Sequence, residues 1–171
     1  YWDNWFADAA GYLGKTVFLP VIGNHDLNLA NVQPTPKPVD MIKYFPISVS
    51  PNFFYYSFNY SMVHFIASQF TWPEDSEIGD EQMDWLEQDL INNQEMPFII
   101  MLFHCPIHDS GAFGEDNILQ TELRPLLDYY NVSLILNGHD HHYERVEEFD
   151  LTYIVLGGGG ARGFSHIGAL R

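Results

Sequence analysis

Three short clusters of polar residues contain side chains that can bind metal ions or transfer protons. Each cluster follows an apolar, β-prone run, and ligands of open α/β sheets lie beyond the carboxyl ends of such strands. If the strands are parallel neighbours, Asn24, His104 and His139 converge on one edge of the sheet. The glycines before Asn24 and His139 permit sharp turns close to a ligand. The clusters are Gly23–Asp26, His104–Pro106 and Gly138–His142.

The pair His139-x-His141 adds a geometric argument. In an extended segment, residues i and i+2 face the same side, so both imidazoles can serve one metal ion or two neighbouring ions. Together with an amide oxygen from Asn24, they favour Zn, Fe(II), Mn or Co over Ca. Two ions about 3.5–4 Å apart would clamp a phosphoryl group and generate hydroxide near neutral pH. The neutral Asn24 leaves positive charge for an anionic substrate, and His25 could protonate a leaving oxygen or hold a phosphate oxygen.

Each cluster alone also has an ordinary structural explanation. The sequence Gly-Asn-His-Asp is usually a turn, and a lone histidine such as His104 is more often a hydrogen-bonded core residue. We expect His64 to be structural and Cys105 to be a small buried hydrophobe. His108 and His142 either support the ligands or are merely solvated. Three clusters at three strand ends are harder to explain in this way, which favours a shared metal site.

Composition narrows the function classes. The chain has 171 residues, of which 46% are hydrophobic and 16% aromatic, enough to bury a core. Seven Lys and Arg residues against 23 Asp and Glu residues give a net charge of −16, which argues against binding nucleic acid. No apolar run approaches the roughly 20 residues that span a membrane. The single cysteine excludes an internal disulfide and a cysteine-rich zinc module.

Continuous apolar strands that alternate with amphipathic helices predict a layered α/β fold with both sheet faces covered. We expect helix 119–130 to be distorted by Pro125 and Asp80 to be the N-cap of another helix. Residues 28–47 contain four prolines and predict a long surface segment. The predicted strands are 16–22, 98–103, 132–136 and 151–156, with an antiparallel pair at 53–60 and 62–68; the predicted helices are 2–13, one from Asp80 to about Leu90, and 119–130.

The clusters and their flanking residues resemble the calcineurin-like metallophosphoesterases, and within them the purple-acid-phosphatase-like branch. The resemblance implies an α/β/β/α sandwich and a hydrolase that cleaves phosphate esters, most simply phosphomonoesters, with a metal-bound hydroxide. The small phosphorylated substrate and two transition-metal ions (Fe, Zn or Mn) are implied in the same way. The matching pieces follow the family order across residues 16–160: Gly23–Asp26, Tyr55–Phe58, Val63–Ile66, Glu81–Leu86, Phe103–Pro106, Leu136–Arg145 and Tyr153–Gly160.

The resemblance also assigns roles to individual residues of this dinuclear centre. His25 would contact the transferring phosphoryl group and Asp26 would orient His25. Tyr143 and Arg145 would support the His-x-His loop. The implied metal ligands are Asn24, His104 and His139 for one ion and His141 for the other.

The family's first motifs, Asp-x-His or Asp-x-Gly and a Gly-Asp-x-x-Tyr-like segment, have no match before Asn24. Asp3 and Asp8 lie in a predicted helix with the wrong neighbours. The sequence therefore supplies three ligands of one metal and one ligand of the other. We interpret residues 1–160 as the C-terminal portion of a phosphoesterase domain, and we expect this piece alone to be inactive or to bind metal weakly, although its parent is an enzyme.

The last residues, 161–171, follow a glycine run and resemble the oxyanion-hole start of patatin-like lipid acyl hydrolases. In those enzymes backbone N–H groups of such a turn stabilise an acyl oxyanion, but the Gly-x-Ser-x-Gly nucleophile is absent here. The alternatives to a phosphatase are therefore a patatin-like fragment and a non-catalytic scaffold. Sequons at Asn59 and Asn131 permit glycosylation only if the protein is secreted from a eukaryote. The frequent export of acid-phosphatase relatives favours a secreted or periplasmic location.

Overall fold

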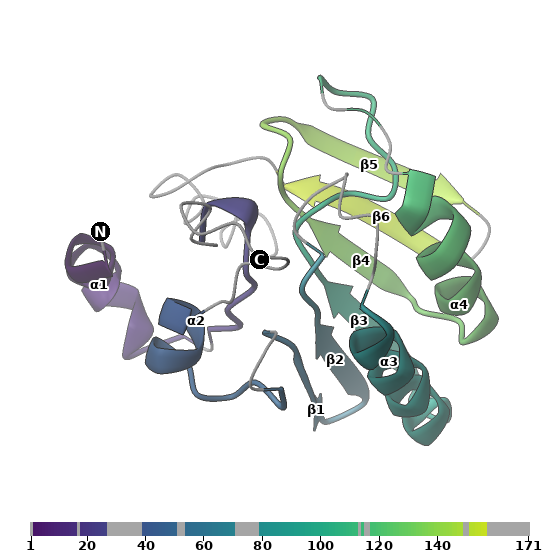
Figure 1. Cartoon of the computed structure of the whole chain (residues 1–171), viewed down its shortest axis with the longest axis horizontal. Coiled ribbons are helices and arrows are strands. Elements are labelled where there is room, and N and C mark those ends of the chain that lie inside the picture. The colour runs from purple at the N-terminus through teal and green to yellow at the C-terminus, as the bar shows by residue number, and fades with distance from the viewer. Residues whose placement is uncertain are drawn as a thin grey trace.

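A six-stranded mixed sheet forms the centre of the computed structural model, which describes residues 2–16, 18–26, 39–50, 54–70, 79–112, 114, 117–148 and 151–156. The strand order is β1-β2-β3-β4-β6-β5, with β2, β3, β4 and β6 parallel and an antiparallel strand at each edge. The carboxyl ends of the parallel strands therefore share one edge of the sheet (Figure 1). The strands are β1 (Tyr56–Tyr60), β2 (Val63–Ala67), β3 (Phe98–Leu102), β4 (Leu134–Asn137), β5 (Tyr143–Glu148) and β6 (Leu151–Leu156).

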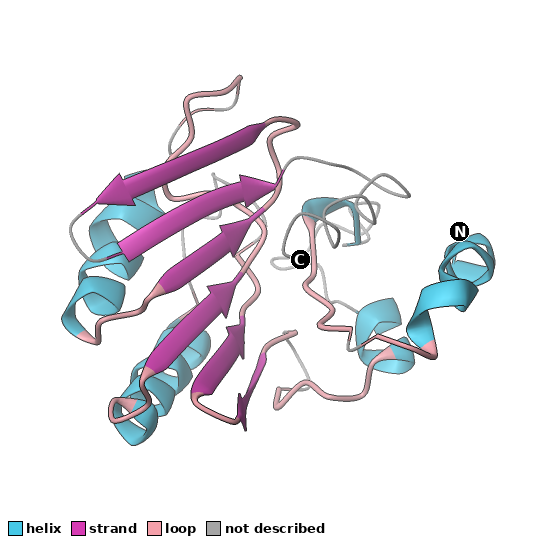
Figure 2. Cartoon of the chain, turned by 180° about the vertical axis from the view of Figure 1, so that it is seen from behind, coloured by secondary structure: helices cyan, strands magenta, loops and turns pink. Residues whose placement is uncertain are grey.

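Two helices, α3 (Asp80–Asn93) and α4 (Arg124–Tyr129), cover the same face of this sheet (Figures 1 and 2). A π-helical turn, Leu119–Leu123, leads directly into α4. Helices α1 (Trp2–Leu13) and α2 (Val39–Tyr44) lie beside the sheet edge where the parallel strands end. None of the described helices is both long enough and apolar enough to cross a bilayer.

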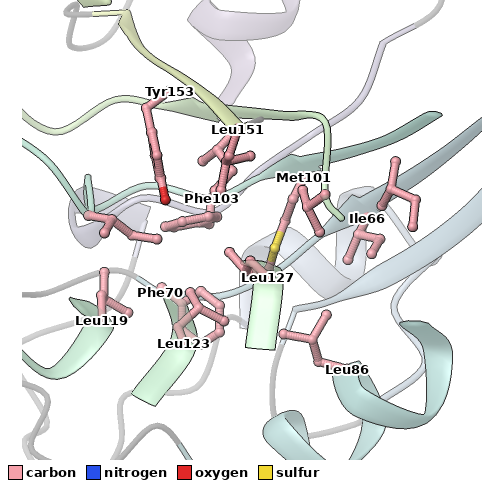
Figure 3. Close-up of a cluster of buried hydrophobic side chains, with 14 of the residues drawn as sticks. Ile66, Phe70, Leu86, Met101, Phe103, Leu119, Leu123, Leu127, Leu151 and Tyr153 are labelled. Atoms are coloured by element: carbon pink, nitrogen blue, oxygen red, sulfur yellow. The ribbon is translucent and has the colours of Figure 1, made fainter. Parts of the chain in front are cut away.

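The main core fills the space between the sheet and α3 and α4 (Figure 3). Leu86 of α3, Leu127 of α4 and Met101 of β3 are completely buried, and Ile66 of β2 contacts the same cluster. Burying each such side chain stabilises the fold by about 1.5–3 kcal/mol before the loss of chain entropy is counted. The apolar side of each helix therefore faces the sheet.

A second, smaller core holds the N-terminal part of the chain against β1 and β2. Ile22, Met41 and Phe54 are buried together there, and the hydroxyl of Tyr56 donates a hydrogen bond of 3.0 Å to the carbonyl oxygen of Pro20. This packing places the short 3₁₀ turn Asn24–Asp26 near the ends of the parallel strands.

The structure confirms the predicted α/β class, the antiparallel pair, the helix 2–13, the helix that begins at Asp80, which continues to Asn93, and the strands near residues 98, 134 and 151. The predicted strand 16–22 is wrong, because residues 18–22 form no ladder with the sheet. Pro20 within this run lacks the N–H group that a paired strand must donate. Within the predicted surface segment 28–47, residues 28–38 lie outside the described residues, and Val39–Tyr44 forms helix α2.

Three local features differ from the predictions in instructive ways. Gly79, not Asp80, is the N-cap of α3, and no side-chain hydrogen bond caps that helix. Pro125 lies in the first turn of α4, where its missing N–H is tolerated, so the predicted distortion takes the form of the preceding π-helical turn. Strand β5 was not predicted, because its sequence is mostly charged, as suits an edge strand that must avoid pairing with other chains.

His64 of β2 is structural, as predicted, and it joins the sheet to α3. Its Nε2 lies 2.7 Å from Oδ2 of Asp89, and its Nδ1 lies 2.5 Å from Oδ1 of Asn59. Ser57 donates a further hydrogen bond to Asp89, and Asn93 donates to the backbone carbonyl of Asp89. Because the side chain of His64 is 2% exposed, this network is shielded from water.

We therefore expect Asp89→Asn to lower the free energy of unfolding by about 2 kcal/mol, because His64 and Ser57 lose hydrogen bonds to a carboxylate in a largely buried network. Asp84→Asn is the matched control, since Asp84 is exposed on the same helix and its loss should change stability by less than about 0.5 kcal/mol. Urea unfolding followed by circular dichroism measures both. Equal effects of the two substitutions would contradict the role of the His64 network.

Candidate metal centre

The loops that follow β3 and β4 are tied together by backbone and amide hydrogen bonds. The side chain of Asn137, at the end of β4, donates to the carbonyl oxygens of Phe103 and Cys105 at 3.1 and 3.3 Å. The N–H of Gly138 donates to the carbonyl oxygen of His104 at 2.9 Å. Cys105 is buried, as predicted for a small hydrophobe. Because β3 and β4 are parallel and these hydrogen bonds join the loops that follow them, the backbones at His104 and His139 lie side by side.

Donor atoms of Asn24, His104 and His139 meet at this edge. The Nε2 atom of His104 lies 2.9 Å from Oδ1 of Asn24 and 3.1 Å from Nδ1 of His139. The two imidazole rings are 5.0 Å apart at an angle of 80°. Asn24 and His139 are largely buried, with 8% and 9% of their surface exposed. The structure therefore brings three of the predicted metal ligands into one group.

Two glycines allow the close approach of these segments to His104. A Cβ atom on Gly23 would lie 3.1 Å from Cε1 of His104, and one on Gly138 would lie 3.4 Å from its Nδ1. His139 itself has a φ of 69°, in the left-handed region that non-glycine residues rarely adopt. The backbone at His139 is therefore held in an unfavourable conformation that aims its ring at His104.

The electrostatics of the group favour neutral imidazoles. Burial, together with the neighbouring charges of His139, His25 and His141, lowers the pKa of His104 to about 3. Burial also lowers the pKa of His139, and the charges of His141 and His25 act in the same direction, against the opposing effect of Asp140. Both rings are thus neutral at pH 7, which is the form that binds metal ions. The same interactions place His25 and His141 within electrostatic reach of the group.

The three donor atoms fit a metal ion. Neighbouring ligands with bonds of about 2.1 Å to one ion lie roughly 3 Å apart, as the two measured separations do. Nε2 of His104 carries at most one hydrogen, yet it faces both an amide oxygen and an imidazole nitrogen. A cation would satisfy all three atoms. Two imidazole nitrogens and one amide oxygen suit Zn, Fe, Mn or Co.

Comparison with known proteins decides the family. A sequence model of the calcineurin-like phosphoesterases matches residues 1–143. The chain belongs to the calcineurin-like phosphoesterase family. Purple acid phosphatase 15 of Arabidopsis thaliana is 29% identical over 94% of this chain and 32% of its own length. Human tartrate-resistant acid phosphatase type 5 is 30% identical over 56% of this chain and 29% of its own length. The chain therefore spans about a third of the length of these relatives.

Solved structures of other proteins share the fold. Purple acid phosphatase PPD1 from yellow lupin seeds matches 82% of this chain and 29% of its own, with a TM-score of 0.61 at 22% identity. A dimetal phosphatase from Danio rerio matches 84% of this chain and 60% of its own, with a TM-score of 0.60 at 15% identity. GAP50 of Plasmodium, described as the anchor in the inner membrane complex, has a TM-score of 0.54 at 26% identity over 64% of this chain and 38% of its own.

The other phosphoesterase residues expected at the site lie around the three central ligands. Asp26 accepts a hydrogen bond of 2.9 Å from the N–H of Gly23, which closes the turn, and burial raises the pKa of its carboxyl group. His25 is exposed beside Asn24. His141 is also exposed, and its N–H donates to Oδ1 of Asp140 at 2.9 Å. The roles assigned to His25, Asp26 and His141 stay predictions.

Tyr143 and Arg145 lie on the solvent side of β5. Tyr143 is 65% exposed, and Arg145 pairs with Glu147 on the same strand. Their predicted support of the His-x-His loop stays a prediction. His108, which the sequence left open, packs against the ring of Tyr153 at 4.7 Å.

Some predictions fall outside what the structure tests. The glycine run and the patatin-like segment 161–171 lie outside the described residues, so that alternative and the proposed boundary at residue 160 stay predictions. Of the two sequons, Asn131 is exposed, whereas the side chain of Asn59 is engaged with His64 and Asn93. Export from the cell also stays a prediction.

Sequence reasoning missed a second polar group at the same edge. Asp109, in the loop after β3, lies beside His142 and Glu144 at the start of β5. The hydrogen bond to Glu144 raises the pKa of His142, and a hydrogen bond from the N–H of Ser110 lowers the pKa of Glu144. The signal in the sequence was the spacing His142-x-Glu144, which puts two ligand types on one side of an extended segment.

We expect Gly23→Ala to weaken Zn²⁺ binding about tenfold, since the new Cβ displaces the His104 ring, and shifts around ligands commonly have effects of about this size. Gly11→Ala is the matched control, because a Cβ there meets nothing within 4 Å. Isothermal titration calorimetry measures both affinities. The same affinity in both variants would show that His104 tolerates displacement.

The pKa of His104 also predicts how stability depends on pH in the metal-free protein. Because the folded-state pKa of about 3 lies below the unfolded value of about 6.5, the unfolded chain binds more protons between these values. The stabilisation from neutral His104 is fully present above pH 6.5 and is lost as the pH falls toward 3. We expect the free energy of unfolding, measured in EDTA, to fall more steeply over this range in the native chain than in a His104→Gln variant. Parallel curves would contradict this assignment.

Proposed function

We propose that the protein to which this chain belongs hydrolyses phosphate esters, most simply small phosphomonoesters, at a centre of two metal ions. The observation that supports this most is the convergence of Asn24, His104 and His139, with donor atoms 2.9 and 3.1 Å apart, in a member of the calcineurin-like phosphoesterase family. Relatives named as acid phosphatases support the substrate class.

Asn24, His104 and His139 would hold one ion, and His141 would be a ligand of the other. When bound, such ions polarise a phosphoryl oxygen and lower the pKa of water. The three ligands of the first ion are neutral, so the charge of a dication remains uncompensated there. This local positive charge would attract a phosphate group in spite of the net charge of −16 of the chain.

His25 would position the substrate and transfer a proton. Its exposed imidazole follows Asn24 directly, so it lies at the open side of the centre, within reach of a phosphate bound there. In its protonated form, Nδ1 or Nε2 would donate a hydrogen bond to a phosphoryl oxygen or a proton to the leaving oxygen. The hydrogen bond from Gly23 to Asp26 keeps the turn closed and so fixes where His25 emerges from it.

A second candidate is a non-catalytic scaffold. The match at 26% identity to GAP50, whose description is that of an anchor, favours this possibility. Such a protein would keep the fold and could even bind metal, but it would not turn over phosphate esters.

Hydrolysis of p-nitrophenyl phosphate by the whole protein tests the proposal and separates the two candidates. Substitution of residues that only support a ligand typically reduces activity about 10–100-fold, so we expect His139→Ala with His141→Ala to reduce kcat/KM about 100-fold or more. Gln88→Ala with Asn92→Ala, on the exposed side of α3, is the control and should leave activity unchanged. Full activity in the histidine variant would refute the assigned ligands, and metal binding without turnover in the native protein would favour the scaffold.

A further inference from the structure

Asp109, His142 and Glu144 form a second group of metal-ligand types, and none of them belongs to the three-ligand centre described above. Their candidate ligand atoms all lie within 4.8 Å of one another. Nε2 of His142 is 3.1 Å from Oε2 of Glu144 and 3.4 Å from Oδ1 of Asp109. The group joins two segments that are about 30 residues apart in sequence, the loop after β3 and the start of β5.

The carboxyl group of Asp109 is the observation that points to a ligand. Its side chain is 0% exposed, and Oδ1 accepts a hydrogen bond of 2.8 Å from the N–H of Gly111. The other oxygen, Oδ2, is buried and accepts no hydrogen bond from the residues that the structure describes. Buried carboxylate oxygens are costly unless they are paired. Asp140 lies within hydrogen-bonding range of Asp109, and two carboxyl groups so placed must share either a proton or a cation.

The charges of the group favour a cation with two positive charges. Nε2 of His142 carries at most one hydrogen, although it faces both Asp109 and Glu144. With a neutral imidazole, Asp109 and Glu144 contribute two negative charges, which one dication would balance, and the neighbouring Asp140 adds to the negative charge that attracts a cation. The separations of 3.1 and 3.4 Å resemble those of neighbouring ligands with metal bonds of about 2.0–2.2 Å.

The backbone around the group is shaped to hold these side chains close together. The N–H of Ser110 donates to Oε2 of Glu144 at 2.9 Å, which fixes that carboxylate against the loop after β3. A Cβ atom on Gly111 would lie 2.0 Å from Oδ2 of Asp140 and 2.6 Å from Cε1 of His142. Any other residue at this position would therefore displace the side chains of Asp140 and His142 from these positions.

We propose that Asp109, His142 and Glu144 bind one divalent transition-metal ion, such as Zn²⁺ or Mn²⁺, at a site separate from the candidate catalytic centre. One imidazole nitrogen and two carboxylate oxygens are ligands that both ions accept. The ion would tie the loop after β3 to the start of β5, and so would brace the two segments that carry His104, His139 and His141. This site does not depend on the proposed phosphatase activity.

Zn²⁺ titration in a variant that lacks the first centre tests the proposal. In a His104→Ala, His139→Ala background at pH 7, calorimetry should still detect one equivalent of bound Zn²⁺. Adding Asp109→Asn and Glu144→Gln to that background should weaken this binding at least about tenfold. Adding Glu147→Gln instead is the matched control, because Glu147 is exposed on the same strand and its substitution should leave the affinity unchanged.

A second measurement guards against a misfolded background. In the chain with its first centre intact, Asp109→Asn with Glu144→Gln should lower the Zn²⁺ stoichiometry by one equivalent, while circular dichroism remains unchanged. If that pair unfolds the chain, the single variant His142→Gln replaces it, since the side chain of His142 is 30% exposed. The proposal is overturned if the background binds no Zn²⁺, or if these substitutions leave binding unchanged, as a proton shared by Asp109 and Asp140 would predict.

Discussion

The constraint on which the site depends is the contact of three donor atoms from segments far apart in sequence. Asn24 and His104 are separated by 80 positions, and His104 and His139 by 35, yet their ligand atoms lie about 3 Å apart. No local propensity can produce such a contact. It requires that β3 and β4 be parallel and in register, so that their loops begin at the same level, and that glycine lie where the backbone passes His104.

The hydrophobic cores supply the rigidity that this contact requires. The main core packs α3 and α4 against one face of the sheet and fixes β3 and β4, whereas the smaller core holds the turn with Asn24 against β1 and β2. Crowding neutral imidazoles against one another costs free energy, as does the left-handed backbone at His139. A protein keeps such unfavourable local conformations only where the surrounding packing holds them in place, and they are typical of sites that bind a ligand.

Sequence reasoning found the elements whose hydrophobic pattern is strong and the ligands that follow them directly. It failed for segments whose conformation depends on contacts with distant parts of the chain. The apolar run before Asn24 has strand-like residues, but Pro20 cannot donate to a ladder and the run packs as irregular chain. Strand β5 is charged because it is an edge, so it carries no hydrophobic signal. The spacing His142-x-Glu144 was a visible signal, but the partnership of these residues with Asp109 joins a strand to a distant loop, and no spacing rule predicts such a contact.

Buried and exposed side chains alternate along residues 140–145, so this short segment can supply residues both to the group around Asp109 and to the candidate metal centre. Asp140, His142 and Glu144 are buried or half-buried and face Asp109, whereas His141, Tyr143 and Arg145 are exposed. A period of two thus sends carboxylates inward, where they need a counter-charge, and leaves the imidazole of His141 on the open side, where further ligands of a second ion can approach. The exposure of His141 leaves its imidazole accessible to an ion that approaches from solvent, as the role proposed for it requires.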